Sequence, residues 1–153
     1  MYLYGRLSNF VDTDADPNIV KELGDVYKRD IQHERHGVLV LDPARIISFR
    51  TDAQLRGGYQ DGNELRQILM RIPRMRLNAN VLDHQLHRQE LFWPDCAPLR
   101  LFYWGTRYFC HKGRELVRFA ELNTGTGIWT SDSMCADGEF GPLDAVALYG
   151  DPL

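Results

Sequence analysis

The stretch Leu99-Arg-Leu-Phe-Tyr-Trp-Gly-Thr-Arg-Tyr-Phe-Cys-His-Lys-Gly-Arg-Glu-Leu-Val-Arg-Phe-Ala-Glu-Leu122 decides the fold class of this chain. Strand-like runs, rich in aromatic and β-branched residues, follow one another in it, and short glycine-containing segments separate them. The runs are Leu99–Trp104, Arg107–His111 and Glu115–Leu122, joined by Gly105-Thr106 and Lys112-Gly113, and Ile128-Trp129-Thr130 follows. Consecutive strands joined by tight turns predict a β-meander.

Upstream of this stretch the apolar residues recur at helical spacing. Ile19, Val20, Leu23, Val26 and Tyr27 predict an amphipathic helix over 17–29, which begins at Asp16-Pro17. A second helix is expected around Leu65, Ile68, Leu69 and Ile72, with Pro73 as its end, and a weaker third one over 80–90 with Asn80 as its cap. Short strands are expected at Tyr2–Tyr4, Val38–Leu41 and Ile46–Phe49.

This order of elements predicts an α+β fold. Two or three helices in the first two thirds should pack on an antiparallel or mixed sheet that ends in the C-terminal β-meander. The 153 residues, with 44% apolar and 25% charged side chains, have the composition of an ordinary globular protein. We therefore expect one domain over residues 1–153.

Charge is unevenly distributed along the chain. The net charge is −3, yet residues 45–76 hold seven arginines against three acidic residues, and residues 119–153 hold six acidic residues without Lys or Arg. The two segments could neutralise each other within the fold, or each could meet a different partner. The densest basic group is Arg71, Arg74 and Arg76, which could contact nucleic acid.

The strong motifs of catalysis are missing from the sequence. It has no Walker motif and no dinucleotide fingerprint, and its three cysteines, Cys96, Cys110 and Cys135, form no CxxC pair. His84, His87 and Glu90 are three residues apart, but a solvated helix face explains them better than a metal site, so no metal is expected. The N-terminus lacks a signal-peptide pattern and no apolar run is long enough to span a bilayer, so we expect no membrane association and a cytoplasmic location.

Three short segments, taken in order, resemble ADP-ribosyltransferases, and most of all the DarT-type enzymes that modify DNA. The segments are Tyr2–Asn9 with Ile19–Leu23, Val38–Ile47 with Phe49–Ala53, and Arg88–Leu99. The resemblance implies an NAD-dependent transferase that acts on nucleic acid or protein. It assigns Arg6 to an NAD phosphate or ribose, Ser48 to the nicotinamide pocket, and Glu90 to the role of catalytic carboxylate.

The competing hypothesis is a small non-catalytic protein-binding module, such as an inhibitor or accessory factor of a phage or mobile element. The aromatic residues of the predicted meander motivate it, because they would form a contact surface if one face of the sheet were open. If helices cover both faces, the same residues belong to the core. They are Phe102, Tyr103, Trp104, Tyr108, Phe109, Phe119 and Trp129.

Overall fold

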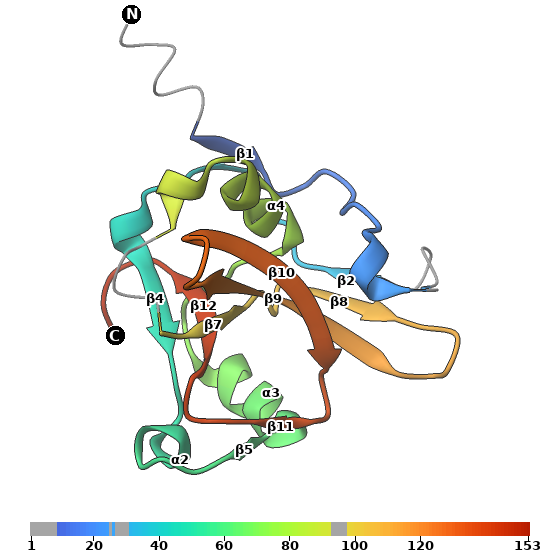
Figure 1. Ribbon diagram of the computed structural model, residues 1–153, viewed down its shortest axis with the longest axis vertical. Helices are drawn as coiled ribbons and strands as arrows, with labels where there is room; N and C mark the ends of the chain where they lie inside the picture. The colour runs from blue at the N-terminus through green and yellow to red at the C-terminus, as the bar shows by residue number, and fades with distance from the viewer. Residues whose placement is uncertain (1–8, 25, 27–30, 93–97) are drawn as a thin grey trace, which may run out of the picture.

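A curled, mixed β-sheet organises the computed structural model, which describes residues 9–24, 26, 31–92 and 98–153 (Figure 1). Its eight strands run in the order β2-β8-β9-β7-β12-β4, with β10 on the free edge of β9 and β6 beside β12. Their bounds are β2 Gln32–His33, β4 Ile46–Phe49, β6 Met75–Arg76, β7 Arg100–Phe102, β8 Thr106–Phe109, β9 Glu115–Asn123, β10 Ile128–Cys135 and β12 Asp144–Tyr149.

Smaller elements complete the fold. The helices are α2 Asp52–Leu55, α3 Gly62–Arg71 and α4 Ala79–His87, with 3₁₀ turns at Lys21–Leu23, Pro43–Arg45 and Gln89–Leu91. Two short antiparallel ribbons pair β1 (Phe10–Asp12) with β3 (Val38–Val40) and β5 (Gln60–Asp61) with β11 (Glu139–Phe140). The predicted α+β class is thus confirmed.

The meander consists of β8, β9 and β10, which are successive antiparallel neighbours. The expected hairpin around Gly105-Thr106 is wrong. Strand β7 pairs with the same edge of β9 as β8 does, with Phe102 opposite Phe119 and Tyr108 opposite Leu116. Residues 100–109 therefore form one strand with an interruption, rather than two strands that face each other.

Gly105 lies in that interruption and brings three segments together. Its N–H donates to the carbonyl of Leu77 at 3.0 Å, and its own carbonyl accepts from the N–H of Glu34 at 2.7 Å. A Cβ atom at this position would lie 2.6 Å from the carbonyl oxygen of Arg76 and 2.9 Å from the carbonyl carbon of Leu77. The chain passes so close here that only glycine fits.

Strand β12 lies inside the sheet, between β7 and the edge strand β4, although it is the last strand of the chain. It runs parallel to β7 and antiparallel to β4, and all of its residues are buried. The parallel pair makes the sheet mixed. Burial on both faces explains why its sequence Ala145-Val-Ala-Leu148 is continuously apolar.

Two helices cover the two faces of this sheet (Figure 1). Leu101 and Tyr103 belong to a buried cluster with Val81 and Leu82 of α4. Their sequence neighbours Phe102 and Trp104 belong to a second cluster with Leu65 and Leu69 of α3. Successive side chains of the strand point to opposite faces of the sheet and thus contribute to both cores. Phe102, Tyr103, Trp104, Tyr108 and Phe119 are buried core residues and Phe109 is half-buried, so these aromatic residues do not form an open contact surface.

Local signals account for the two longer helices. The carboxylate of Asp61 accepts from the N–H of Glu64 and caps α3, as expected for a helix over this region that ends before Pro73. The third predicted helix corresponds to α4, but its cap is Asn78 rather than Asn80, because the Asn78 side chain accepts from the N–H groups of Asn80 and Val81.

The helix predicted over 17–29 is wrong where the structure describes it. Residues 17–20 belong to no helix or strand, a 3₁₀ turn covers Lys21–Leu23, and Gly24 ends it at a φ of 64°. Val26 forms a β-bridge with Cys110. Leu23 is buried but Ile19 is exposed, so the apolar spacing does not define one buried face. The strand expected at Tyr2–Tyr4 lies outside the described residues.

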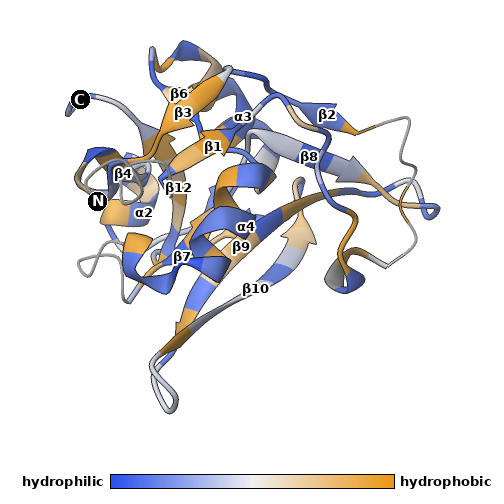
Figure 2. Ribbon diagram, turned by 90° about the horizontal axis from the view of Figure 1, so that it is seen from above, coloured by the Kyte–Doolittle hydropathy of each residue, from blue (hydrophilic) through white to orange (hydrophobic). Residues whose placement is uncertain are grey.

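The β1–β3 ribbon has one buried and one exposed face, whereas helices cover both faces of the large sheet. Val11 is buried, whereas Phe10, Val38 and Val40 on the other face are exposed, and the ribbon is largely hydrophobic in Figure 2. None of the helices that the structure describes is both long enough and apolar enough to cross a membrane.

Candidate functional site

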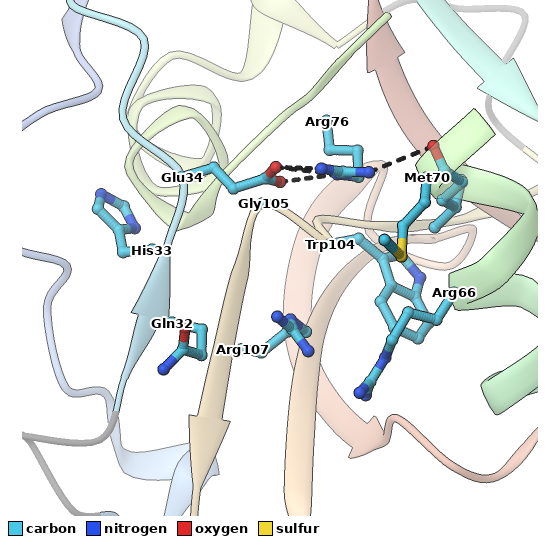
Figure 3. Close-up of a pocket in the computed structure, with 10 residues that line it drawn as sticks. Gln32, His33, Glu34, Arg66, Met70, Arg76, Trp104, Gly105 and Arg107 are labelled. Carbon is cyan, nitrogen blue, oxygen red and sulfur yellow. Dashed lines mark hydrogen bonds and ion pairs between the residues drawn. The ribbon is translucent and has the colours of Figure 1, made fainter. Parts of the chain in front are cut away.

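A cavity of about 270 Å³ opens where β2, β6, α3 and the interrupted strand β7–β8 meet (Figure 3). We call it the Arg66–Trp104 pocket. Gly105 lies in its wall, so the close approach of Gly105 to β6 also shapes the cavity. The lining residues are Gln32, His33, Glu34, Arg66, Leu69, Met70, Arg76, Trp104, Gly105 and Arg107.

Helix α3 supplies one wall through a single face. Arg66, Leu69 and Met70 are three and four residues apart, which places them side by side on a helix. Leu69 points into the core, while Met70 is 68% exposed and borders the opening. The pocket therefore combines an apolar rim with a charged interior.

Two arginines of this pocket share one carboxylate. Arg107 Nη1 donates to Glu115 Oε1 at 2.6 Å, and Arg66 Nη2 donates to Glu115 Oε2. Only 15% of the Glu115 side chain is exposed, so solvent screens this group weakly. Two guanidinium groups and one carboxylate leave a local excess of one positive charge. In Figure 3 both arginines lie on the side of the cavity away from Glu34 and Arg76.

The third arginine is neutralised. Arg76 Nε donates to both oxygens of Glu34, at 2.8 and 3.1 Å, and its Nη2 also contacts Glu34. These hydrogen bonds raise the pKa of Arg76 above its usual value. Arg76 Nη1 donates to the carbonyl of Leu69 at 3.2 Å, so this guanidinium is fixed between β2 and α3.

Two buried N–H donors at the pocket have no acceptor among the described residues. They are the indole Nε1 of Trp104, whose side chain is 3% exposed, and Nε of Arg66. A buried donor without an acceptor costs about 1–3 kcal/mol. Native proteins rarely keep such donors unless water or a ligand supplies the acceptor.

His33 fixes the far wall of the pocket. Its Nε2 donates to the carbonyl of Thr13 at 2.9 Å, so its Nδ1 accepts from the hydroxyl of Thr106 at 2.7 Å when the ring is neutral. The same hydroxyl accepts from the N–H of Ala79 at the start of α4. Burial lowers the pKa of His33, chiefly by disfavouring the charged ring.

These side chains provide hydrogen-bond donors and positive charge. The lining that the structure describes includes no serine, cysteine or lysine, and both ring nitrogens of His33 are engaged. What the cavity offers is an excess of N–H donors and one net positive charge. Such a site recognises an anion with oxygen acceptors.

The residues implied by the resemblance do not meet in this pocket. Glu90 follows α4 with a 61% exposed side chain, and its carboxylate pairs with Arg88 Nε at 2.5 Å. Hydrogen bonds from its own backbone N–H and from Arg88 lower its pKa. Ser48 lies in β4 opposite Ala147 of β12. Arg6 lies outside the described residues.

The three arginines predicted to contact nucleic acid have separate environments. Arg76 belongs to the Arg66–Trp104 pocket, and Arg74 donates to the carbonyls of Asp151 and Pro152 at 2.7 and 3.2 Å. Arg71 lies at the end of α3 and lines a different hollow, together with Arg50 and Asp52. The basic cluster in the sequence is thus divided among three places in the structure.

The described part of the chain contains no cluster of three or more His, Cys, Asp and Glu side chains that could hold a metal ion. His84, His87 and Glu90 therefore do not form one. Cys135 is the last residue of β10 and is half-buried.

Trp104, Arg66, Arg107 and Glu115 were not singled out by sequence reasoning. The sequence pattern predicts only that Trp104 is one of several aromatic strand residues and that Arg66 lies on the solvated face of a helix. Arg107 and Glu115 lie eight residues apart across the β8–β9 turn, which is the one signal in the sequence that could have joined them.

Comparison of the chain with protein-family models, with curated proteins and with solved structures finds no match.

Proposed function

We propose that this protein is a non-catalytic binding module that holds an anionic, oxygen-bearing group of its ligand in the Arg66–Trp104 pocket. One observation carries the proposal: two buried donors, Trp104 Nε1 and Arg66 Nε, have no acceptor among the described residues, at a pocket where two guanidinium groups share one described carboxylate. An oxyanion supplies the acceptors and the opposite charge together. Its binding would therefore recover the free energy that a buried donor without an acceptor costs.

The size of the pocket favours the end of a larger ligand. Its volume of about 270 Å³ lies below the range of roughly 300–1,000 Å³ that is usual for small-molecule sites. Met70 at the rim offers an unbranched apolar side chain to whatever continues outside the cavity. Because both donors are buried, the ligand reaches them only when neighbouring side chains shift.

A direct test uses small anions as probes. Sodium acetate, sodium methyl sulfate and sodium methyl phosphate are titrated at constant ionic strength, and heat release and melting temperature are recorded against sodium chloride. The Trp104→Phe variant keeps an aromatic ring and removes the indole donor together with part of the ring volume. Trp129→Phe is the matched control, because Trp129 stacks on Phe92 in the core and lies outside this pocket.

We expect saturable binding of at least one probe to the wild type and to Trp129→Phe, with at least a tenfold loss in Trp104→Phe. If no probe binds, or if the two variants bind alike, the pocket is not an anion site and the proposal fails.

The transferase hypothesis stays a prediction of the resemblance. Its Glu90 is exposed and paired with Arg88, and Glu90 and Ser48 lie outside the lining of the Arg66–Trp104 pocket. Titration with NAD, using wild type and Arg6→Ala, tests it independently of the anion probes. Binding of NAD that Arg6→Ala abolishes and Trp104→Phe leaves intact would establish a nucleotide site elsewhere and favour the enzyme.

A further inference from the structure

Resting on the proposed function, we infer that the anionic group is a singly charged carboxylate, and that the pocket discriminates against the doubly charged phosphate of a phosphoester. The inference depends on the charge balance of the site, on the number of donors it leaves open, and on the charge of the whole chain.

The charge balance is the first argument. Arg76 and Glu34 neutralise each other, and Arg66 and Arg107 share Glu115, so the pocket carries one excess positive charge. A carboxylate brings that charge to zero. A phosphomonoester, which is close to doubly charged at pH 7.5, would leave a net negative charge in a partly buried site, where uncompensated charge is costly.

The donors that lack acceptors are the second argument. Trp104 Nε1 and Arg66 Nε are two buried donors, and a carboxylate has two oxygens that can accept one bond each. The terminal oxygens of a phosphomonoester number three, so one of them would face the buried lining without a donor. Carboxylates also suit the arginines already present, because Arg76 binds both oxygens of Glu34 and Arg107 binds Glu115.

The charge of the chain is the third argument. The net charge is −3, and residues 119–153 contribute six acidic side chains and no basic one. Such a chain does not attract a polyanion over long range, so a nucleic-acid backbone is a poor ligand. A single carboxylate needs only the local field of Arg66 and Arg107.

A carboxylate can come from a free metabolite or from a protein, and the experiment separates the two sources. The probes are acetate, methyl sulfate, methyl phosphate, the peptide acetyl-Gly-Glu-Gly-amide with one side-chain carboxylate, and acetyl-Gly-Gly-Gly with a free C-terminus. All are titrated into the intact chain at pH 7.5 and constant ionic strength, and into Trp104→Phe. Methyl sulfate has one charge but three terminal oxygens, so it separates the effect of charge from that of donor number.

We expect acetate to bind at least tenfold more tightly than methyl phosphate, with methyl sulfate between them, and Trp104→Phe to reduce the binding of acetate. A peptide that binds more tightly than acetate identifies a protein ligand, and equal binding identifies a free carboxylate. Methyl phosphate that binds as tightly as acetate, and loses its binding in Trp104→Phe, overturns the inference and leaves the anion site standing. If no probe responds to Trp104→Phe, the proposed function fails and the inference fails with it.

Discussion

Replacement of Glu115 by glutamine should lower the stability of the protein and raise its affinity for anions. The substitution keeps the shape of the side chain and removes the only carboxylate that Arg66 and Arg107 share within the described residues. Loss of one partner from a fully buried ion pair costs about 3–5 kcal/mol. Since the two arginine side chains are 32% and 27% exposed, we expect the smaller loss of about 1–3 kcal/mol. For a chain of this length, that loss lowers the melting temperature by roughly 3–10 °C.

The effect on binding has the opposite sign. The excess positive charge of the pocket rises from one to two, and a unit charge removed from within about 10 Å of the ligand changes its energy by roughly 1–2 kcal/mol at an effective dielectric constant of about 20. The affinity for acetate should therefore increase about tenfold. Differential scanning calorimetry and isothermal titration calorimetry measure the two effects.

Glu121→Gln is the control, because Glu121 lies on the same strand, is exposed, and does not contact Arg66 or Arg107 in the structure. We expect it to change both quantities little. A Glu115→Gln variant that loses stability but binds acetate no better than the wild type would refute the charge balance assigned to the pocket.

Three further predictions concern other parts of the account. Gly105→Ala should destabilise the protein by about 1–3 kcal/mol and weaken acetate binding, because its Cβ meets the Arg76 carbonyl; denaturation in urea measures the first effect. Because burial lowers the pKa of His33, the free energy of unfolding should fall as pH drops below about 6.5, toward that lowered pKa, and His33→Gln should remove this slope whereas exposed His36→Gln should not. Glu90→Gln should leave the melting temperature unchanged within about 2 °C, as expected for an exposed ion pair, and loss of an NAD-dependent activity in this variant would instead support the transferase.

The sequence predicted the elements that local signals determine. Helix α3 has an aspartate cap and the apolar residues Leu65 and Leu69 on its buried side, and β3, β4, β9 and β10 have the composition and spacing of strands. The helix predicted over 17–29 was wrong because apolar residues at helical spacing need a neighbouring surface to pack against. Leu23 is buried against such a surface, but Ile19 is exposed, and Gly24 ends the 3₁₀ turn.

Sequence patterns could not predict which strands, far apart in the chain, pair with each other. Nothing local shows that β12 lies between β7 and β4, or that residues 100–109 pair with one edge of β9. The position of Gly105 against β6 depends on contacts between segments about 28 residues apart. As a result, Gly105 forms part of the wall of a pocket and not the turn that was expected there. Glycine in a strand suggested a turn or a close approach, and only the fold decides between them.

The pocket could not be predicted for the same reason. Arg66 belongs to α3, Arg107 to β8 and Glu115 to β9, and Trp104 lies between β7 and β8. They meet only because α3 packs on the face that carries Trp104. In the sequence, arginine was conspicuous at positions 71–76, yet the fold separates those three side chains. Charge density along the chain indicated Arg71, Arg74 and Arg76, and their contact with nucleic acid stays a prediction. Burial and the shared carboxylate of Glu115 instead direct attention to Arg66 and Arg107.

The most direct test of the central claim is the indole N–H resonance of Trp104 in a ¹H–¹⁵N correlation spectrum during titration with acetate. The chain has three tryptophans, so the Trp104→Phe variant identifies this resonance by its loss. We expect it to move downfield and to saturate as the indole gains an oxygen acceptor, while the other two indole resonances stay in place. An indole resonance of Trp104 that does not respond to acetate, methyl sulfate or methyl phosphate would contradict the assignment of this pocket as an anion site.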